Sequence, residues 1–466
     1  MSLLTDIFKK FNKTKNNEEQ QTQTTSQSSS RNTLMGIMDV FSLKDNEEDL
    51  IVVGQVKGNI HVGDSVYLTN CGEDDNDRFS TTILGIETAP GVSVQEATDC
   101  NVGLRIENGK QYKVKKGTVL FSKRSTSSEI QNIYTSTLGD VFVVRQNMAI
   151  SEEDLELLSI ADCAEIIRLF LWFLSKSETD ESEEIKKSNG MKLNHVRAAL
   201  CKKIINAEEI YCIYSKITGE PHLFSRTVKK DDGSYMCMPP YVLLSTKQYE
   251  RVLMVSLSED KYEMRKIEND DERKEIMNFL GNTFYLNGAC EACILGEQVR
   301  IPAQMLVAMP DYSNVEPIKV PLTNPNLMRW LLLISQLGKP ENEDAQTIYN
   351  LYYRFMAKEL LKSRLLIPMQ HDGELPVTNE NGKTTLTKNV NIKLPTMNGK
   401  NEKRAVRMYT DWKQLRKEFG EEWGGMVQSV EGMIDTFDCA INVTQSSQGG
   451  CYITKDMFEG MKKFED

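Results

Sequence analysis

The stretch VGQVKGNIHVGDSVYLTN, from Val53 to Asn70, decides how the first part of this chain folds. Apolar and polar residues alternate toward both of its ends, which is typical of β-strands with one buried face. Between them, Gly63-Asp64 suits a tight hairpin whose backbone needs a positive φ angle. Similar short segments, separated by Gly, Asn and Asp, continue from Leu34 to about Phe121. Several close strands with tight turns and no helical period predict a small closed β-barrel.

Two further stretches carry the same pattern, TTILGIETAPGVSVQEATDCNVGLRI (Thr81–Ile106) and YKVKKGTVLF (Tyr112–Phe121). Together with the first stretch they resemble the second domain of elongation factor Tu and its relatives, over residues 34–122. The positions that match the family pattern are Gly54, Val56, Val62, Gly63, Asp64, Gly85, Ile86, Glu87, Asn101, Val102, Gly103, Leu104, Gly117 and Val119. The resemblance implies the barrel fold, and Gly103 is expected to allow a close approach of the backbone. In that family the barrel rests on a GTPase domain and contacts RNA.

The charge of the chain argues against nucleic acid as a partner. The 466 residues carry a formal net charge of −11. Residues 34–122 hold 14 Asp and Glu against 8 Lys and Arg, a difference of −6. Binding to RNA or DNA depends on Lys and Arg side chains that neutralise phosphates. We therefore expect the acidic barrel to be a poor platform for RNA.

Length and composition predict a multidomain protein of the cytoplasm. At 466 residues the chain is too long for one ordinary core. No apolar run approaches the roughly 18–20 residues that a membrane-spanning helix needs. The N-terminus lacks the apolar region and cleavage site of a signal peptide. The ten cysteines have no framework spacing, which favours reduced and buried thiols.

The first 33 residues form a unit of their own. Four apolar residues of MSLLTDIFKKFNK recur at helical spacing, namely Leu4, Ile7, Phe8 and Phe11. From Asn16 to Arg31 the chain is almost entirely Gln, Thr, Ser, Asn and Glu, which predicts a flexible linker. A basic amphipathic helix on a tether can dock weakly on a membrane surface or on a partner, so a peripheral location is a secondary expectation. The alternative is a frayed tail whose periodicity arises by chance.

The rest of the chain reads as one α+β module that occurs twice. Ile204 in the first copy corresponds to Leu360 in the second, an offset of 156 residues. Near the ends of the copies, Ile301 corresponds to Ile453, an offset of 152 residues. Nearly equal offsets at both ends indicate a duplication. The predicted fold is multidomain and has four parts: the helix and linker of residues 1–33, a small all-β barrel at 34–125, and tandem α+β modules at 126–313 and 314–466.

The second copy, over roughly residues 324–466, resembles the N-terminal domain of SseB-like proteins. Three stretches carry the resemblance: LLIPM (Leu365–Met369), VRMYTDWKQLRKEF (Val406–Phe419) and CAINVTQSSQGGCYITKDMF (Cys439–Phe458). The sequence departs from the family at Tyr409-Thr410-Asp411, where Phe-Thr-Ser is usual, and at Val443, where Pro is usual. The first copy, over roughly 135–313, is a more degenerate version. The resemblance implies an α+β module and supplies no catalytic residue.

A nucleotide site is suggested by NENGKTTLTKN (Asn379–Asn389), which ends like a phosphate-binding loop. Such a loop also needs an earlier glycine, a preceding strand and a following helix. Val377 stands where that glycine belongs, and the residues after Thr384 alternate as in a strand. We therefore expect a hairpin turn and no nucleotide cofactor.

Candidate metal and catalytic residues are few. Cys290 and Cys293 form a C-x-x-C pair, which is half of a zinc site or a redox pair. No second pair completes a zinc site, so core or loop cysteines are the alternative interpretation. The four histidines lie outside any catalytic signature: His61, His195, His222 and His371.

Aromatic residues of the second copy are candidates for an interaction site. Tyr409, Trp412 and Trp423 lie near Gly424-Gly425, and such a set can form a peptide-binding groove. A place in the core is the alternative. Because no catalytic constellation emerges, we expect a non-enzymatic binding or scaffold protein whose modules and barrel bind protein partners. The alternatives are a translation- or ribosome-associated accessory factor and a redox or metal site at the C-x-x-C pair.

Overall fold

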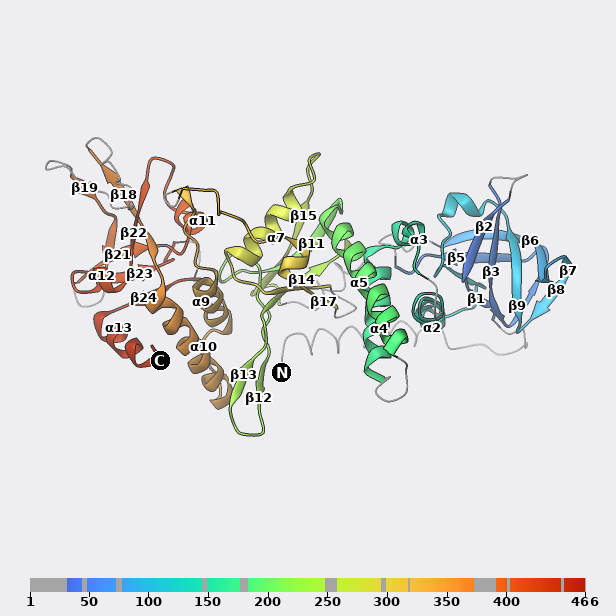
Figure 1. The fold of residues 1–466 in the computed structure, drawn as a ribbon, viewed down its shortest axis with the longest axis horizontal. Helices are drawn as coiled ribbons and strands as arrows, with labels where there is room; N and C mark the ends of the chain where they lie inside the picture. Colours follow the sequence, from blue (N-terminus) through green and yellow to red (C-terminus); the bar gives the residue numbers. More distant parts are fainter. Residues whose placement is uncertain are drawn as a thin grey trace. The chain divides into compact units, whose positions relative to one another are not determined.

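The computed structural model describes residues 32–43, 48–72, 78–144, 149–176, 183–247, 258–294, 299–316, 319–372, 391–399, 403–445 and 448–465. The four apolar residues Leu4, Ile7, Phe8 and Phe11 lie outside the described residues, as does the stretch Asn379–Asn389. Contacts divide the chain into two compact units, whose elements are labelled in Figure 1. The first unit comprises residues 1–210, 245–256 and 294–299, and the second comprises 211–244, 257–293 and 300–466. The module boundaries expected from the sequence, 126–313 and 314–466, stay predictions.

A closed six-stranded barrel belongs to the first unit and confirms the predicted barrel (Figure 1). In ring order the strands are β1 (Leu34–Gly36), β10 (Val119–Phe121), β5 (Ser65–Thr69), β6 (Phe79–Ala89), β9 (Asn101–Ile106) and β3 (Leu50–Lys57). The ring closes where β3 pairs with β1. Four further strands accompany it: β2 (Asp39–Ser42) on β3, β7 (Val92–Val94) on β6, and the pair of β4 (Asn59–His61) with β8 (Glu96–Thr98).

Alternation along β3 explains how the barrel forms its core and closes. Leu50, Val52 and Val56 are buried, as expected of a strand that turns every second side chain inward. A Cβ atom at Gly54 would lie 2.3 Å from the carbonyl oxygen of Gly36. Only glycine therefore lets β3 approach β1 closely enough to close the ring.

The turn after β4 has the geometry that the sequence predicts. Gly63 adopts a φ angle of 93°, and the Asp64 carboxylate accepts the N–H of His61 at 2.8 Å. The expectation for Gly103 is wrong. A Cβ atom there would lie 3.8 Å from Ile51, an ordinary van der Waals distance, so no close backbone approach requires the glycine.

Helices follow the barrel within the first unit. They are α2 (Ser127–Leu138), α3 (Glu152–Leu157), α4 (Ile160–Lys176) and α5 (Glu183–Ile205), with a π-helical turn at Gly139–Val144. Thr126 starts α2 through a capping box with Glu129, which satisfies two backbone donors that a helix start leaves open.

A buried ion pair ties the barrel to these helices. The Lys115 ammonium, in the segment before β10, lies 2.7 Å from the Asp162 carboxylate on α4. The hydroxyl of Tyr134 donates to the same carboxylate at 2.7 Å, and the N–H of Ser159 donates at 2.9 Å. Burial alone raises the pKa of Asp162, but the charge and hydrogen bond of Lys115 outweigh it and hold the pKa below its usual value.

A five-stranded sheet belongs chiefly to the second unit. Its order is β15 (Tyr262–Glu268), β11 (Glu209–Ser215), β14 (Tyr241–Ser245), β16 (Glu291–Ile294) and β17 (Val299–Pro302). The hairpin of β12 (Thr227–Lys229) and β13 (Tyr235–Cys237) lies between β11 and β14 in the chain, and α7 (Glu275–Tyr285) and α8 (Ala303–Leu306) complete this part.

The remaining elements of the second unit build a mixed sheet against helices. The helices are α9 (Pro325–Leu337), α10 (Glu343–Lys362), α11 (Trp412–Arg416), α12 (Glu431–Ile434) and α13 (Lys455–Met461). One strand group has the order β19 (Ile392–Lys393), β18 (Leu365–His371), β22 (Gly424–Gln428), and the other has β20 (Thr396–Asn398), β21 (Arg404–Met408), β23 (Asp438–Ile441), β24 (Cys451–Ile453). A bridge from Leu366 to Tyr409 joins the two groups. The expected mixture of helix and strand is present, and among the described residues no helix is both long and apolar enough to cross a bilayer.

We expect Asp162→Asn to destabilise the first unit, because it leaves the Lys115 ammonium buried without a counter-charge. The free energy of unfolding should fall by about 3–5 kcal/mol. Denaturant unfolding of the full chain, followed by hydrogen exchange of barrel peptides, measures the change. The control is Asp154→Asn, which removes a partly exposed partner 3.0 Å from Lys116 and should cost at most about 1 kcal/mol. Equal losses in the two variants would contradict a structural role for the buried pair.

Candidate functional site

The carboxylate of Glu220 is the most heavily bonded charge in the second unit among the described residues. A tight turn places it: the N–H of Gly219 donates to Ser215, whose own N–H donates to the Glu220 carbonyl. The side chain is buried and accepts four hydrogen bonds. The donors are Lys413 at 2.9 Å, Lys417 at 2.5 Å, Gln414 at 2.8 Å and Asn287 at 2.8 Å. Burial alone raises the pKa of Glu220, but the two ammonium groups outweigh it and lower the pKa to about 2.

Three of the four donors to Glu220 come from the α11 region, and the N-cap of α11 sets their positions. The Asp411 carboxylate accepts the N–H of Gln414 at 2.9 Å and so fixes the first turn. Residues three or four apart in a helix share one face, so Lys413, Gln414 and Lys417 reach toward the same carboxylate. Burial raises the pKa of Asp411 itself. The cluster joins the β11 turn to α11 within the second unit.

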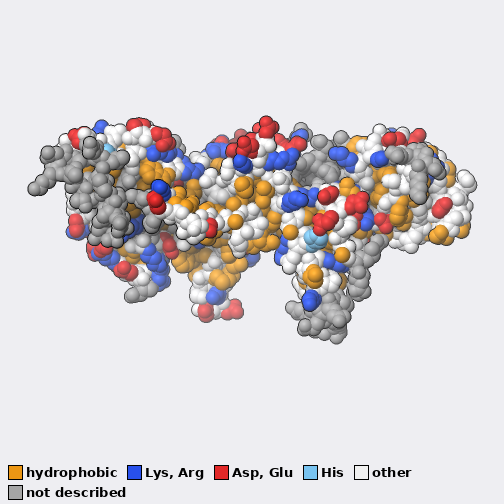
Figure 2. Space-filling view, turned by 45° about the horizontal axis from the view of Figure 1, so that its top comes forward, with side chains coloured by type: hydrophobic (Ala, Val, Ile, Leu, Met, Phe, Trp, Pro, Cys, Tyr) orange, Lys and Arg blue, Asp and Glu red, His pale blue; other side chains and the backbone are white. Residues whose placement is uncertain are grey.

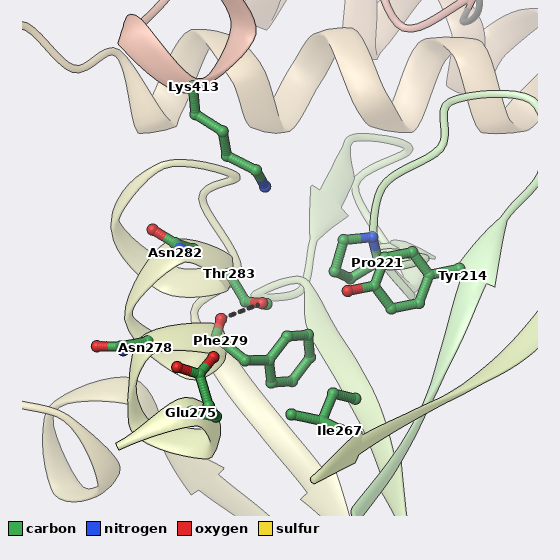
Figure 3. A pocket seen from close by; sticks show the side chains of 9 residues that line it. All are labelled: Tyr214, Pro221, Ile267, Glu275, Asn278, Phe279, Asn282, Thr283 and Lys413. Carbon is green, nitrogen blue, oxygen red and sulfur yellow. Dashed lines mark hydrogen bonds between the residues drawn. The ribbon is translucent and has the colours of Figure 1, made fainter. Parts of the chain in front are cut away.

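An open cavity of about 260 Å³ lies beside this cluster (Figure 3). Its lining residues are Tyr214, Pro221, Ile267, Glu275, Asn278, Phe279, Asn282, Thr283 and Lys413. Figure 3 shows the ammonium end of Lys413 extending toward the cavity from one side, while Glu275 stands on the other. The ammonium of Lys413 is already paired with Glu220. This arrangement can hold a polar or apolar group of a ligand.

His222 is a buried packing residue of the second unit. Its ring meets Phe224 and Tyr262 edge-on, with centroids 4.6 and 5.0 Å apart. Burial lowers its pKa to about 4, so the ring is neutral at pH 7. The structure places the other histidines separately: His61 beside Glu96 at 3.1 Å, His195 beside Glu152 at 2.7 Å, and His371 at the end of β18. No group of three His, Cys, Asp or Glu side chains suited to a metal exists in the part of the chain that is described.

The C-x-x-C pair does not form a joint site. Cys293 lies within β16, and Cys290 immediately precedes that strand. Successive side chains of an extended chain point to opposite faces, so residues three apart point away from each other. Burial raises the pKa of Cys293 to about 12 and also raises that of Cys290. Neither thiol is therefore activated as a nucleophile or metal ligand.

The predicted aromatic site needs a correction. Tyr409 is fully buried, with 0% of its surface exposed, and cannot contact a partner. It packs with Leu366, Leu415 and Phe419. Trp412 and Trp423 border this cluster and stay half-buried. The sequence did not reveal the burial of Tyr409 because that burial depends on the long-range bridge to Leu366.

Strand β22, which lies beside the two tryptophans, is the outermost strand of the group β19, β18, β22. Among the described residues it pairs with β18 alone. The N–H and C=O of Leu366 bond to Tyr409, and backbone groups of alternate residues in a strand point to opposite sides. Leu365, Ile367 and Met369 must therefore point toward β22.

The register then identifies the free groups of β22. Gly424, Met426 and Gln428 lie opposite Met369, Ile367 and Leu365 and bond to β18. The N–H and C=O groups of Gly425 and Val427 point outward, and no described residue bonds to them. The ring of Trp412 covers Gly425, where a Cβ atom would lie 2.7 Å from the ring. A second chain laid along this edge would therefore run beside Trp412.

The two edge strands of the five-stranded sheet differ from β22 in charge, whereas the three-residue edge strands β20 and β24 are uncharged like β22. β15 carries Glu263, Arg265, Lys266 and Glu268, and β17 carries Arg300 and Pro302. Charged side chains and proline discourage another chain from pairing with an edge. β22 has the sequence GGMVQ, with no charge and no proline. Sequence reasoning noted its glycines but missed the edge, since strand order depends on contacts distant in the chain.

We expect Glu220→Gln to lower the free energy of unfolding of the second unit by about 1–3 kcal/mol, because the partly exposed ammonium groups of Lys413 and Lys417 lose a charged hydrogen-bond acceptor. Hydrogen exchange of second-unit peptides in the full chain measures the loss. Glu275→Gln, at the exposed side of the cavity, is the matched control and should change little. The pKa of Glu220 is depressed, so its contribution is complete above about pH 4.5 and disappears as the pH falls toward 2. A loss independent of pH across that window would argue against the ionic role.

The lowered pKa of His222 predicts a second pH range in which the stability of the protein changes. The unfolded chain binds its proton near pH 6.5 and the folded chain near pH 4. The unfolded state therefore binds more protons between these values, and stability falls by about 3 kcal/mol as the pH drops through them. His222→Phe keeps an aromatic ring beside Phe224 and removes the titration. Urea unfolding at pH 7 and pH 4 should show a flatter pH dependence for the variant. Identical slopes for both proteins would contradict the assignment.

Comparison with known proteins finds no family model that matches the chain and no matching curated protein. Among solved structures, the apo form of translation elongation factor SelB from Methanococcus maripaludis is 23% identical over 23% of this chain and 22% of that chain, with a TM-score of 0.17. The same factor in complex with the GTP analogue GPPNHP is 21% identical over 23% of this chain and 22% of that chain, with a TM-score of 0.18. The chain spans about a fifth of the length of these structures. The resemblance of residues 324–466 to SseB-like proteins stays a prediction.

Proposed function

We propose that the protein is a non-enzymatic binding protein whose second unit takes an extended segment of a protein partner as an added strand on β22. The observation that carries the proposal is the unguarded outward edge of β22. An extended chain can exchange hydrogen bonds with the outward groups of Gly425 and Val427 without disturbing the pairing to β18.

Side chains beside the edge supply the contacts that would favour some partners over others. Val427 is 41% exposed and lies opposite Leu366, so it shares a sheet face with the aromatic cluster. Trp412 and Trp423 lie on or next to this face. Tryptophans of this kind often dominate the energy of protein interfaces. The fitting partner is an extended segment with apolar residues at every second position, because alternate side chains of an added strand meet one face.

The ionisable groups support binding rather than chemistry. Glu220 is saturated by four donors, His222 is neutral at pH 7, and the pKa values of both C-x-x-C thiols are raised. Figure 2 shows acidic and basic side chains interspersed over the surface in view. The excess of acidic residues in the barrel sequence likewise favours protein over nucleic acid as the partner.

Selection from a library of unstructured peptides tests the proposal with the full chain. We expect the selected peptides to carry apolar residues at alternate positions and to slow hydrogen exchange at the amides of Gly425 and Val427. Val427→Pro removes one outward N–H and should weaken binding at least about tenfold, the equivalent of one or two net hydrogen bonds.

Val427→Thr is the matched control, since it keeps both the N–H and the β-branched shape. Exchange of β18 amides verifies that each variant keeps its sheet, because proline is tolerated where the N–H points to solvent. Peptides that bind the Val427→Pro variant as tightly as the unchanged protein would show that the edge is not the binding site.

A further inference from the structure

We propose that a second cavity, within the second unit, binds a small neutral aromatic molecule that carries a hydroxyl group, of which phenol is the simplest. The cavity has a volume of about 210 Å³ and lies between α9, α10, β24 and α13. This site is separate from the β22 edge, because no residue of that strand lines the cavity.

The walls of the cavity are largely apolar and belong to the core of the second unit. Leu331 on α9, Met356 on α10 and Ile453 on β24 line it, and each is at most 3% exposed. All three belong to one buried cluster, against which Met457 on α13 packs. Protein interiors hold few voids larger than a water molecule, so a space of this size beside a packed core is a distinctive feature.

The volume sets the size of the ligand. An engineered apolar cavity of about 150 Å³ in another protein stays dry and binds benzene. A cavity of about 210 Å³ therefore has room for one aromatic ring with a substituent. It is smaller than the sites of roughly 300–1,000 Å³ that enclose drug-sized ligands.

Hydroxyl groups at the cavity set the polarity of that substituent. Ser335 on α9 and Tyr349 and Tyr353 on α10 line the cavity, and their hydroxyls have no hydrogen-bond partner in the part of the chain that the structure describes. Residues four apart share one face of a helix, so the two tyrosines lie side by side. Burial raises the pKa of Tyr353, and the neighbouring Cys451 thiol and Tyr349 hydroxyl raise it further. The Tyr353 hydroxyl is therefore neutral at pH 7 and can both donate and accept a hydrogen bond.

Walls and hydroxyls together define the ligand class. Apolar walls with a small number of polar groups are the usual composition of a small-molecule site. A hydroxyl on the ring can bond to the Tyr353 hydroxyl, which a plain hydrocarbon cannot do. No charged side chain among the described residues lines the cavity, so burying a carboxylate or an ammonium group there would be costly. A neutral phenol fits these conditions.

NMR of the full chain with isotope-labelled methionine methyl groups tests the proposal, because Met356 and Met457 line the cavity. The variants Met356→Leu and Met457→Leu assign their signals. Phenol should shift both signals with a dissociation constant below about 1 mM, a modest affinity for a ligand of this size. Met191, which is 67% exposed and belongs to the first unit, should not shift. Benzene should bind about three- to tenfold more weakly, the equivalent of one net hydrogen bond.

Tyr353→Phe tests the role of the hydroxyl and keeps the ring. It should weaken phenol binding about three- to tenfold and leave benzene binding unchanged. Tyr312→Phe is the matched control, at a tyrosine outside the cavity that is 38% exposed. If phenol leaves the signals of Met356 and Met457 in place, the cavity holds water only and the proposal is overturned. Equal effects of Tyr353→Phe on phenol and benzene would overturn it as well.

Discussion

The second unit depends on one buried carboxylate. Glu220 takes hydrogen bonds from Asn287 and from three residues of the α11 region, and its bond to Lys417 joins residues 197 positions apart. A buried charge is costly unless it is paired and fully hydrogen-bonded, so the four donors and the acceptor specify one another's positions. The position of α11 in turn sets Trp412 over Gly425. The ionic cluster and the edge of β22 are thus parts of one arrangement.

The first unit uses the same physical device in a different place. Asp162 on α4 accepts from Lys115 before β10 and from Tyr134 on α2. In both units a buried carboxylate binds a lysine that is distant in sequence and accepts further hydrogen bonds from nearby groups. The lysine of the first unit is buried as well, whereas Lys413 and Lys417 of the second unit stay partly exposed. Apolar packing alone tolerates several similar arrangements, whereas a buried ion pair is satisfied in few of them.

Local patterns predicted the parts of the fold that depend on local chemistry. The alternation around Val53–Asn70 and the turn at Gly63 predicted strands, a hairpin and a barrel, because side-chain period and backbone φ are properties of short segments. The reason proposed for Gly103 was wrong, and Gly54 is the glycine at which two strands approach closely. That distinction requires knowing that β1 and β3 pair, which the sequence of either strand does not contain.

The candidate site was harder to predict for the same reason. The aromatic residues around Trp412 were found by their spacing, but the burial of Tyr409 depends on Leu366, which lies more than forty residues earlier in the chain. The sequence did not point to Glu220, because the residues next to it in the chain do not show that its hydrogen-bond donors lie almost 200 positions later, in the α11 region. The absence of charge in GGMVQ is visible in the sequence, yet it gains meaning only when the strand is known to be an edge.

The buried pair of Lys115 and Asp162 has a consequence for how this chain can change over generations. Replacing either residue alone leaves the other as an unpaired buried charge, while replacing both with apolar residues of similar size can be neutral. A substitution at either position alone therefore destabilises the protein, and it is tolerated only together with a substitution at the other position. We therefore expect the barrel sequence and the α4 sequence to change together at these two positions.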